Sequence, residues 1–387
     1  MVVQHNLQAM NSNRMLGVTT SSQAKVTEKL SSGYKINRAA DDAAGLSISE
    51  KMRKQIRGLD QASNNAQDGV SAVQTAEGAL AEVHDMLQRM NELAVQAANG
   101  TNSTSDRTAI QNEIDQLTTE IDRVAETTKF NETYLLKGGD ETKTVTMKAH
   151  DAGLKGSLTV AADGKSATFK PAALETSDKV MIGGKEYKIV TTGADQNNGL
   201  ITKGTAENLM KEELVKANSI GLDAPLPADK VTGDLTGGFT ITMGEQTVAN
   251  ALSFNLHVGA DADMTNKINV NIDTMNSAFL GVKGLDVVGT DGIGTQATYA
   301  IDAIADAIQK VSDQRSALGA VQNRLEHTIK NLDNVVENTT AAESQIRDTD
   351  MASTMVEYTK NNILQQAGQS MLAQANQSTQ GVLSLLG

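Results

Sequence analysis

The sequence predicts a mainly α-helical protein with a β-rich insert: a long antiparallel coiled-coil-like helical bundle formed by the N- and C-terminal regions, plus a small outer domain. The three prolines lie at positions 171, 225 and 227 only. Of the 32 glycines, 21 fall within residues 138–294. Apolar residues recur at heptad spacing on both sides of this middle region. Because helices exclude proline and are weakened by internal glycine, the ends are predicted helical and the middle strand-rich.

The first helical region contains a continuous apolar seam. Alternating steps of three and four from Leu59 to Ala97 meet only apolar or small residues. Such a seam, sustained over five heptads, is typical of a coiled-coil-like helix. Asn99 and Gly100 offer a stop, and Ser103 begins a capping sequence. A shorter seam from 110 to 124 then predicts a second helix, so the two should form a hairpin.

A second long seam runs from Ile301 to Ile346, with four of its fourteen positions polar. It predicts a helix that packs antiparallel to the first and brings both termini to one end. Between the two seams, alternating and β-branched runs predict hairpins at 156–169 and around Gly183–Gly184. Further strands are predicted at 252–258 and 268–272, and one short helix at 205–217.

The two ends of the chain are almost uncharged. Residues 361–387 carry no charge, and Arg14 is the only charged residue in 1–24. Apolar residues at helical spacing predict a polymerisation interface with copies of the same chain, formed by Val3, Leu7, Met10, Leu364, Met371, Val382 and Leu386. Docking of these helices onto their own domain is the alternative. A membrane-surface helix is less favoured because a cationic face is missing.

Composition and motifs argue against several classes of function. The chain has no cysteine, which excludes disulfides and thiolate metal sites, and its net charge of −13 argues against nucleic-acid binding. The sequence contains no apolar run of 18 residues, so we expect no membrane insertion. The first ten residues do not resemble a secretory signal peptide. The five histidines are not spaced as a helical zinc pair, and no nucleophile or phosphate-binding motif occurs. We therefore expect no metal, no cofactor and no enzymatic activity.

Residues 30–101, which begin LSSGYKINRAADDAAGLSISEKMRKQIRGLDQASNNAQDG, closely resemble bacterial flagellin. NEIDQLTTEIDRVAETTKFN (112–131), LHVGADADMTNKINVNIDTM (256–275) and the span from Tyr299 to Leu386 continue the resemblance. Residues 138–251 match no pattern, as expected for the variable insert of this family. One departure is Glu132, which stands where the family usually has the glycine of Phe-Asn-Gly.

The resemblance implies a subunit that polymerises into the flagellar filament for swimming motility. It implies residues 1–42 with 347–387 as inner-tube helices, 43–140 with 252–346 as an outer-tube domain, and 141–251 as a surface-exposed variable domain. The expected location is extracellular, after export by the flagellar type III apparatus. The expected partners are further copies of the chain, an export chaperone, and the cap and hook–filament junction proteins.

The resemblance also implies recognition by host Toll-like receptor 5. Carried over residue by residue, the receptor-binding positions are Leu87, Gln88, Arg89, Leu93, Gln96, Ile110, Glu113 and Gln116. Leu87 also belongs to the first seam, where core packing is its alternative role, while Arg89 and Glu113 lie off the seams. Three other readings of the chain stay open: a hook–filament junction protein, a surface adhesin acting through its insert, and an enzymatic insert.

Overall fold

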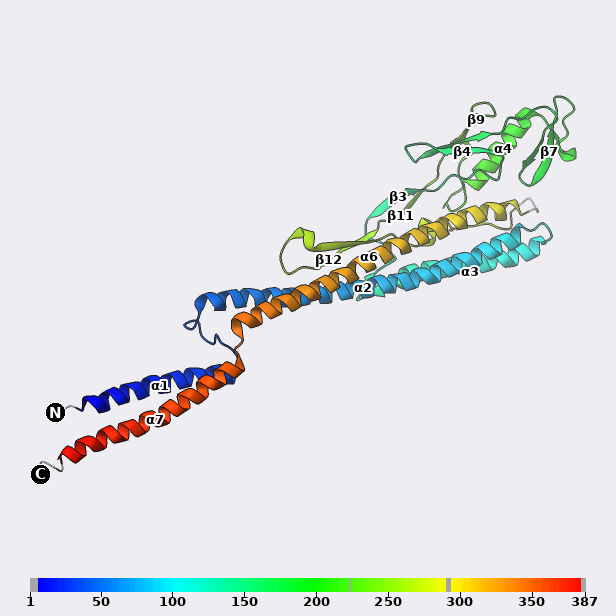
Figure 1. The fold of residues 1–387 in the computed structure, drawn as a ribbon. Helices are drawn as coiled ribbons and strands as arrows, with labels where there is room; N and C mark the ends of the chain where they lie inside the picture. Colours follow the sequence, from blue (N-terminus) through cyan, green and yellow to red (C-terminus); the bar gives the residue numbers. More distant parts are fainter. Residues whose placement is uncertain (1–5, 223, 290–293, 384–387) are drawn as a thin grey trace. The chain divides into compact units, whose positions relative to one another are not determined.

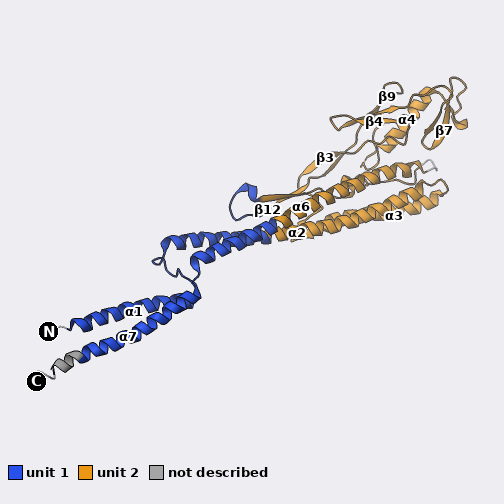
Figure 2. Ribbon diagram, viewed as in Figure 1, with its two compact units in different colours: residues 1–64, 258–266, 328–387 blue, residues 65–257, 267–327 orange. Residues whose placement is uncertain are grey.

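The computed structural model describes the 387-residue chain except for residues 1–5, 223, 290–293 and 384–387 (Figure 1). Contacts divide the chain into two compact units (Figure 2). Unit 1 comprises residues 1–64, 258–266 and 328–387, and unit 2 comprises residues 65–257 and 267–327. The α-helices are α1 (Leu7–Ser32), α2 (Ala43–Ala98), α3 (Thr104–Thr127), α4 (Lys203–Ala217), α5 (Ser277–Leu280), α6 (Thr295–Arg347) and α7 (Met351–Leu383). The three-part domain organisation expected from the family resemblance stays a prediction.

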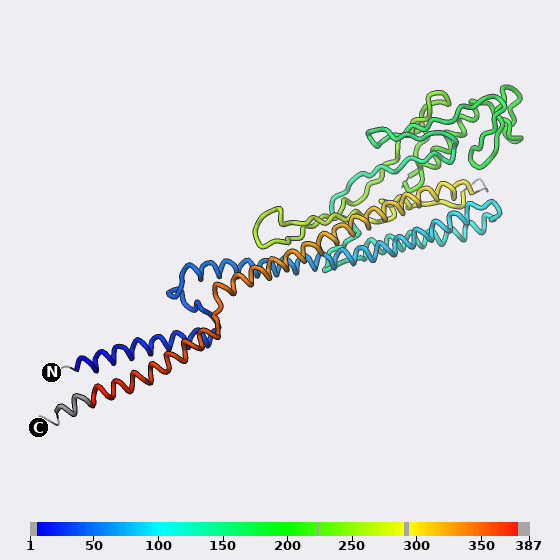
Figure 3. Tube along the Cα trace, in the orientation of Figure 1, coloured from blue at the N-terminus to red at the C-terminus, as the bar shows by residue number. Residues whose placement is uncertain are grey.

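In unit 1, α1 and α7 lie side by side and run antiparallel (Figure 3). Asn6 caps α1 by accepting a hydrogen bond from the Ala9 amide, and its side-chain amide donates to the carbonyl of Ala375 at 3.1 Å. Asn361 of α7 donates to the Ser22 hydroxyl at 3.3 Å. Val26 and Ala375 are among the few buried apolar residues of this pair. The pair is thus fixed by a narrow seam.

Unit 1 also contains the residues at which α1 ends and those that precede α7. Gly33 ends α1 with a left-handed φ of 76°, a conformation that glycine adopts at no steric cost. Tyr34 then forms an antiparallel bridge to Asp348, and the guanidinium carbons of Arg347 and Arg53 lie 4.8 and 5.6 Å from the centre of its ring. These cation–π contacts hold the segment that follows α1 against the segment that precedes α7.

The predicted seam of α2 is confirmed. All of its positions from Leu59 to Ala97 are buried. Gly69 is the glycine of this seam. Within unit 2 the β12/β13 hairpin packs so closely against it that a Cβ at this position would overlap the side chain of Leu256. The predicted α2–α3 hairpin is also confirmed, since Ile110, Ile114 and Ile121 of α3 are buried in one cluster with the α2 seam. Ser103 and Asp106 form a reciprocal capping box at the start of α3.

Two of the four polar positions in the seam of α6 have partners on α2. In unit 2, Arg315 lies 3.7 Å from the carboxylate of Glu77. In unit 1, Glu343 pairs with Arg53 at 3.2 Å and accepts a hydrogen bond from Ser49 at 2.9 Å. At Arg315 and Glu343 the heptad pattern is therefore interrupted by polar contacts between the helices, whereas Gln322 donates to Glu326 of its own helix at 3.0 Å.

Strands occupy the middle of the chain, in unit 2. They are β1 (Lys129–Phe130), β2 (Thr133–Tyr134), β3 (Thr142–Thr146), β4 (Gly156–Val160), β5 (Ser166–Pro171), β6 (Lys179–Ile182), β7 (Lys185–Ile189), β8 (Leu200–Ile201), β9 (Val231–Asp234), β10 (Gly238–Thr242), β11 (Glu245–Ala249), β12 (Leu252–His257) and β13 (Lys267–Ile272). Pairing gives sheets β4-β5-β10-β9 and β6-β7-β8 and the two-stranded pairs β1-β2, β11-β3 and β12-β13. The predicted hairpins and the short helix α4 are confirmed.

The insert has its own apolar core. Phe169 and Phe239 are fully buried, and Leu214 of α4 packs with them. Tyr299 from α6 joins this cluster and donates a hydrogen bond to Glu213 at 2.8 Å. The insert is therefore anchored on the start of α6.

The turn between β1 and β2 keeps left-handed backbone despite its departure from the family pattern. Asn131 and Glu132 have φ values of 45° and 68°, as in a two-residue type I′ turn. A side chain at the second position is unfavourable, and for this reason glycine is the usual residue there. Glu132 therefore carries local backbone strain.

Candidate self-assembly surface

The apolar residues predicted for polymerisation lie on the outside of the α1/α7 pair wherever they are described. Leu7, Met10, Leu364 and Met371 are 70%, 62%, 47% and 58% exposed. Val3 and Leu386 lie outside the described residues, as does the side chain of Val382. Side chains this apolar are seldom left in water as a continuous set, so the surface is suited to association.

The exposed apolar surface is larger than the sequence indicated. It also includes Met15, Val18, Met351, Met355, Val356 and Ile363. Periodicity alone did not identify these residues because they stand beside the seam that α1 and α7 use for each other. Their sequence signal is an apolar residue at a position where a surface helix would ordinarily carry charge.

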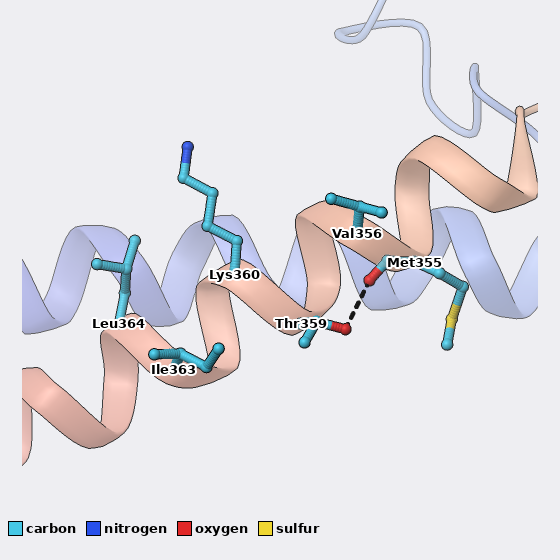
Figure 4. Close-up of a pocket in the computed structure, with 6 residues that line it drawn as sticks. All are labelled: Met355, Val356, Thr359, Lys360, Ile363 and Leu364. Atoms are coloured by element: carbon cyan, nitrogen blue, oxygen red, sulfur yellow. Dashed lines mark hydrogen bonds between the residues drawn. The ribbon is translucent and has the colours of Figure 1, made fainter.

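Two shallow grooves follow this surface. One, of about 520 Å³, is lined by Met355, Val356, Thr359, Lys360, Ile363 and Leu364, and Lys360 is its one charged residue (Figure 4). Thr359 turns its hydroxyl inward to the carbonyl of Met355 at 2.9 Å, which removes a polar group from the groove. A second groove, of about 430 Å³, has Met15 and Leu16 of α1 on one side and Gly368 and Met371 of α7 on the other.

Charge distinguishes this surface from the rest of the chain. Unit 1 contains 12 basic and 13 acidic residues, whereas unit 2 contains 22 and 34. Almost the whole net charge of −13 therefore belongs to unit 2. Copies that meet through unit 1 would meet little electrostatic repulsion at short range.

The positions that the resemblance assigns to receptor binding divide by burial. Five of them are exposed on α2 and α3, namely Gln88, Arg89, Gln96, Glu113 and Gln116. Leu87, Leu93 and Ile110 are buried in the core of unit 2. These three side chains support the hairpin from within, and only the five exposed ones present a surface in this conformation.

Arg89 and Glu113 form an ion pair that joins α2 to α3. The Arg89 Nε donates to Glu113 at 2.9 Å, and its Nη1 donates to Glu92 at 3.0 Å. Hydrogen bonds to Glu113 and then to Glu92 raise the pKa of Arg89. The sequence could not reveal this pair, because it depends on the register between two helices.

Other kinds of site have little support in the part of the chain that the structure describes. No group of three or more His, Asp or Glu side chains is placed to hold a metal ion there. Asp263, in the acidic turn between β12 and β13, accepts a hydrogen bond from the Thr265 amide at 2.9 Å. No helix among these residues is both long enough and apolar enough to cross a membrane.

Comparisons with known proteins agree with this architecture. Residues 3–141 match the family model for the bacterial flagellin N-terminal helical region, and residues 301–386 match the C-terminal one. A flagellin of Clostridium tyrobutyricum is 45% identical over 98% of this chain and 100% of its own length. The chain belongs to the bacterial flagellin family. As a member, it is a structural subunit of the flagellar filament.

Two further relatives show the same extent of similarity. A flagellin of Halalkalibacterium halodurans is 41% identical, and a flagellar filament core protein of Treponema maltophilum is 40% identical, each over the full length of both chains. Among solved structures, a Bacillus cereus flagellin is 19% identical over 70% of this chain and 88% of that chain, with a TM-score of 0.34.

Proposed function

We propose that this filament subunit polymerises through the exposed apolar surface of α1 and α7 and so serves swimming motility. The observation that carries the proposal is the row of exposed apolar residues from Leu7 to Met15 and from Met351 to Met371. Burial of such area against other copies yields about 25 cal/mol per Å². Because subunit contacts in a helical fibre do not close into a ring, they repeat along its whole length.

Seeded elongation of purified monomer, followed by light scattering and electron microscopy, tests the proposal. Deletion of 361–387 should abolish elongation, and Leu364→Ser should slow it by at least tenfold, roughly the cost of burying a hydroxyl in place of a leucine. Val160→Ser is the matched control, because Val160 is 54% exposed on β4 of the insert. Unchanged elongation by the Leu364 variant, or equal loss in the control, would contradict the proposal.

We further propose the cellular route that accompanies this role. The subunit is exported by the flagellar type III apparatus, with an export chaperone and the cap and hook–filament junction proteins as partners, and acts outside the cell. Family membership supports this proposal. Secretion assays in a strain that lacks the export apparatus test it, and release of the chain into the medium by that strain would contradict it.

We propose a second role, as a ligand of Toll-like receptor 5, at the exposed face of α2 and α3. The supporting observation is the pairing of Arg89 with Glu113 beside Gln88, Gln96 and Gln116 on one exposed hairpin. Arg89→Ala should weaken binding to the receptor ectodomain by about tenfold, the effect of losing one paired arginine at an interface.

Arg123→Ala is the control for this variant. Arg123 forms a similar exposed pair with Glu120 on α3 but does not belong to the receptor-binding positions. Surface plasmon resonance should show that the control binds as the wild type does, while both variants elongate normally. Equal binding by the wild type and the Arg89 variant would contradict the receptor proposal alone.

A further inference from the structure

Methionine is the main oxidisable side chain of this protein. The chain has 15 methionines, no cysteine and no tryptophan. In unit 2, Met90, Met210 and Met275 are almost fully buried. On α1 and α7, by contrast, five methionines are between 50% and 62% exposed, namely Met10, Met15, Met351, Met355 and Met371. Thioether oxidation follows exposure, so these five sulfur atoms are accessible to a dissolved oxidant.

Three of these methionines lie in the two grooves of the self-assembly surface. Met355 lines the groove on α7, where its side chain extends from the helix and its sulfur lies apart from the other side chains drawn (Figure 4). Met15 and Met371 line the groove between α1 and α7. Oxidation at these positions would place a polar sulfoxide where the proposed contact requires an apolar side chain.

We propose that these five methionines are a modification site for peroxides and that their oxidation blocks assembly of the free subunit. The inference rests on the proposed polymerisation through α1 and α7. The assembled filament is protected, because the same contacts that bury the thioethers exclude the oxidant. Subunits are therefore vulnerable before assembly and resistant after it.

The reaction is a transfer of one oxygen atom from hydrogen peroxide to sulfur. The sulfur lone pair forms the new S–O bond while the O–O bond breaks. The departing hydroxide takes the proton of the transferred oxygen and leaves as water. The thioether is oxidised by two electrons and the peroxide is reduced by two. Reduction by methionine sulfoxide reductases reverses the change.

The test uses hydrogen peroxide on full-length monomer, with sulfoxides located by peptide mass spectrometry and activity measured as seeded elongation. The oxidised wild type should elongate at least tenfold more slowly than untreated protein, roughly the cost of burying one polar sulfoxide. A leucine variant that combines Met10→Leu, Met15→Leu, Met351→Leu, Met355→Leu and Met371→Leu should elongate after peroxide treatment at the rate it shows without treatment. A control with Met181→Leu and Met264→Leu, both exposed outside α1 and α7, should lose elongation as the wild type does.

The outcomes separate this inference from the proposed function. Normal elongation by wild type that carries all five sulfoxides overturns the inference, and so does equal loss in the leucine variant. Failure of untreated wild type to elongate contradicts the proposed polymerisation instead. If the leucine variant assembles poorly, treatment of oxidised wild type with sulfoxide reductases decides the question. Restored elongation supports the inference, and elongation that stays low although the sulfoxides are removed overturns it.

Discussion

Unit 1 and unit 2 use apolar residues in opposite ways. Of the 17 large apolar side chains that are exposed in the described part of the chain, 13 belong to unit 1, although unit 2 is the larger unit. Unit 2 instead buries its apolar residues in two extensive clusters, one between the helices and one in the insert. Unit 2 thus has the interior of a folded domain, whereas much of unit 1 resembles half of an interface.

The distribution of charge follows the same division. Unit 2 carries the excess acidic residues, which keep a folded surface hydrated, while unit 1 is close to neutral. Substitutions of buried residues in unit 2 should therefore act on folding, and substitutions on the outside of α1 and α7 should act on assembly. The predictions that follow test this separation.

The largest effect is expected for Leu80→Ala. Leu80 is fully buried in the seam of α2, so the change removes apolar contacts and leaves a cavity in unit 2. The free energy of unfolding should fall by about 2–5 kcal/mol. Urea denaturation followed by far-UV circular dichroism measures it, and a loss below about 1 kcal/mol would contradict the assigned core.

A smaller effect is expected at the start of α3. Ser103→Ala removes the hydroxyl that accepts from the Asp106 amide, and helix caps of this kind contribute about 1 kcal/mol. Thr108→Ala is a control, since the Thr108 hydroxyl only donates to a carbonyl of its own helix. Similar losses in both variants would show that the cap has no special role.

The same cap predicts a dependence on pH. Hydrogen bonds from the hydroxyl and amide of Ser103 lower the pKa of Asp106 from its ordinary value of 3.8. Its contribution to stability is therefore complete above pH 3.8 and is lost as the pH falls through the lowered pKa. Asp106→Asn should remove this component from the acid limb of the stability curve, and an acid limb unchanged in the variant would refute the assignment.

Glu132→Gly should stabilise unit 2, in contrast to the preceding changes. It relieves the left-handed strain at the second turn position, which costs on the order of 1 kcal/mol, less the extra freedom that glycine has in the unfolded chain. The net gain should be about 0.5 kcal/mol in urea denaturation. Destabilisation by the glycine variant would show that the Glu132 side chain has a stabilising contact.

The smallest effect on folding is expected for Leu7→Ala, which repeats the chemistry of Leu80→Ala on the exposed side of α1. Leu7 is 70% exposed, so the free energy of unfolding should change by no more than about 0.5 kcal/mol. Seeded elongation should nevertheless slow. A stability loss comparable to that of Leu80→Ala would break the distinction between the two units.

The helical seams could be predicted from the sequence because the heptad spacing of apolar residues is visible within a single sequence. The contact between α2 and α3 could not, because Leu93 lies off the predicted seam and is buried where a second helix widens the apolar stripe of α2. The Arg89–Glu113 pair depends on the same packing. The exposed apolar residues beside the α1/α7 seam, such as Val356, could not be assigned from the sequence, because helical spacing alone does not show which apolar positions are covered within one chain.

The central claim is that the outside of α1 and α7 is covered in the filament. Hydroxyl-radical footprinting of monomer and seeded filament, read by mass spectrometry, compares the reactivity of Val356, Ile363 and Leu364 before and after assembly. The account predicts strong protection of these three residues, while Val160 on the insert keeps its reactivity. Equal reactivity of the three residues in monomer and filament would contradict it.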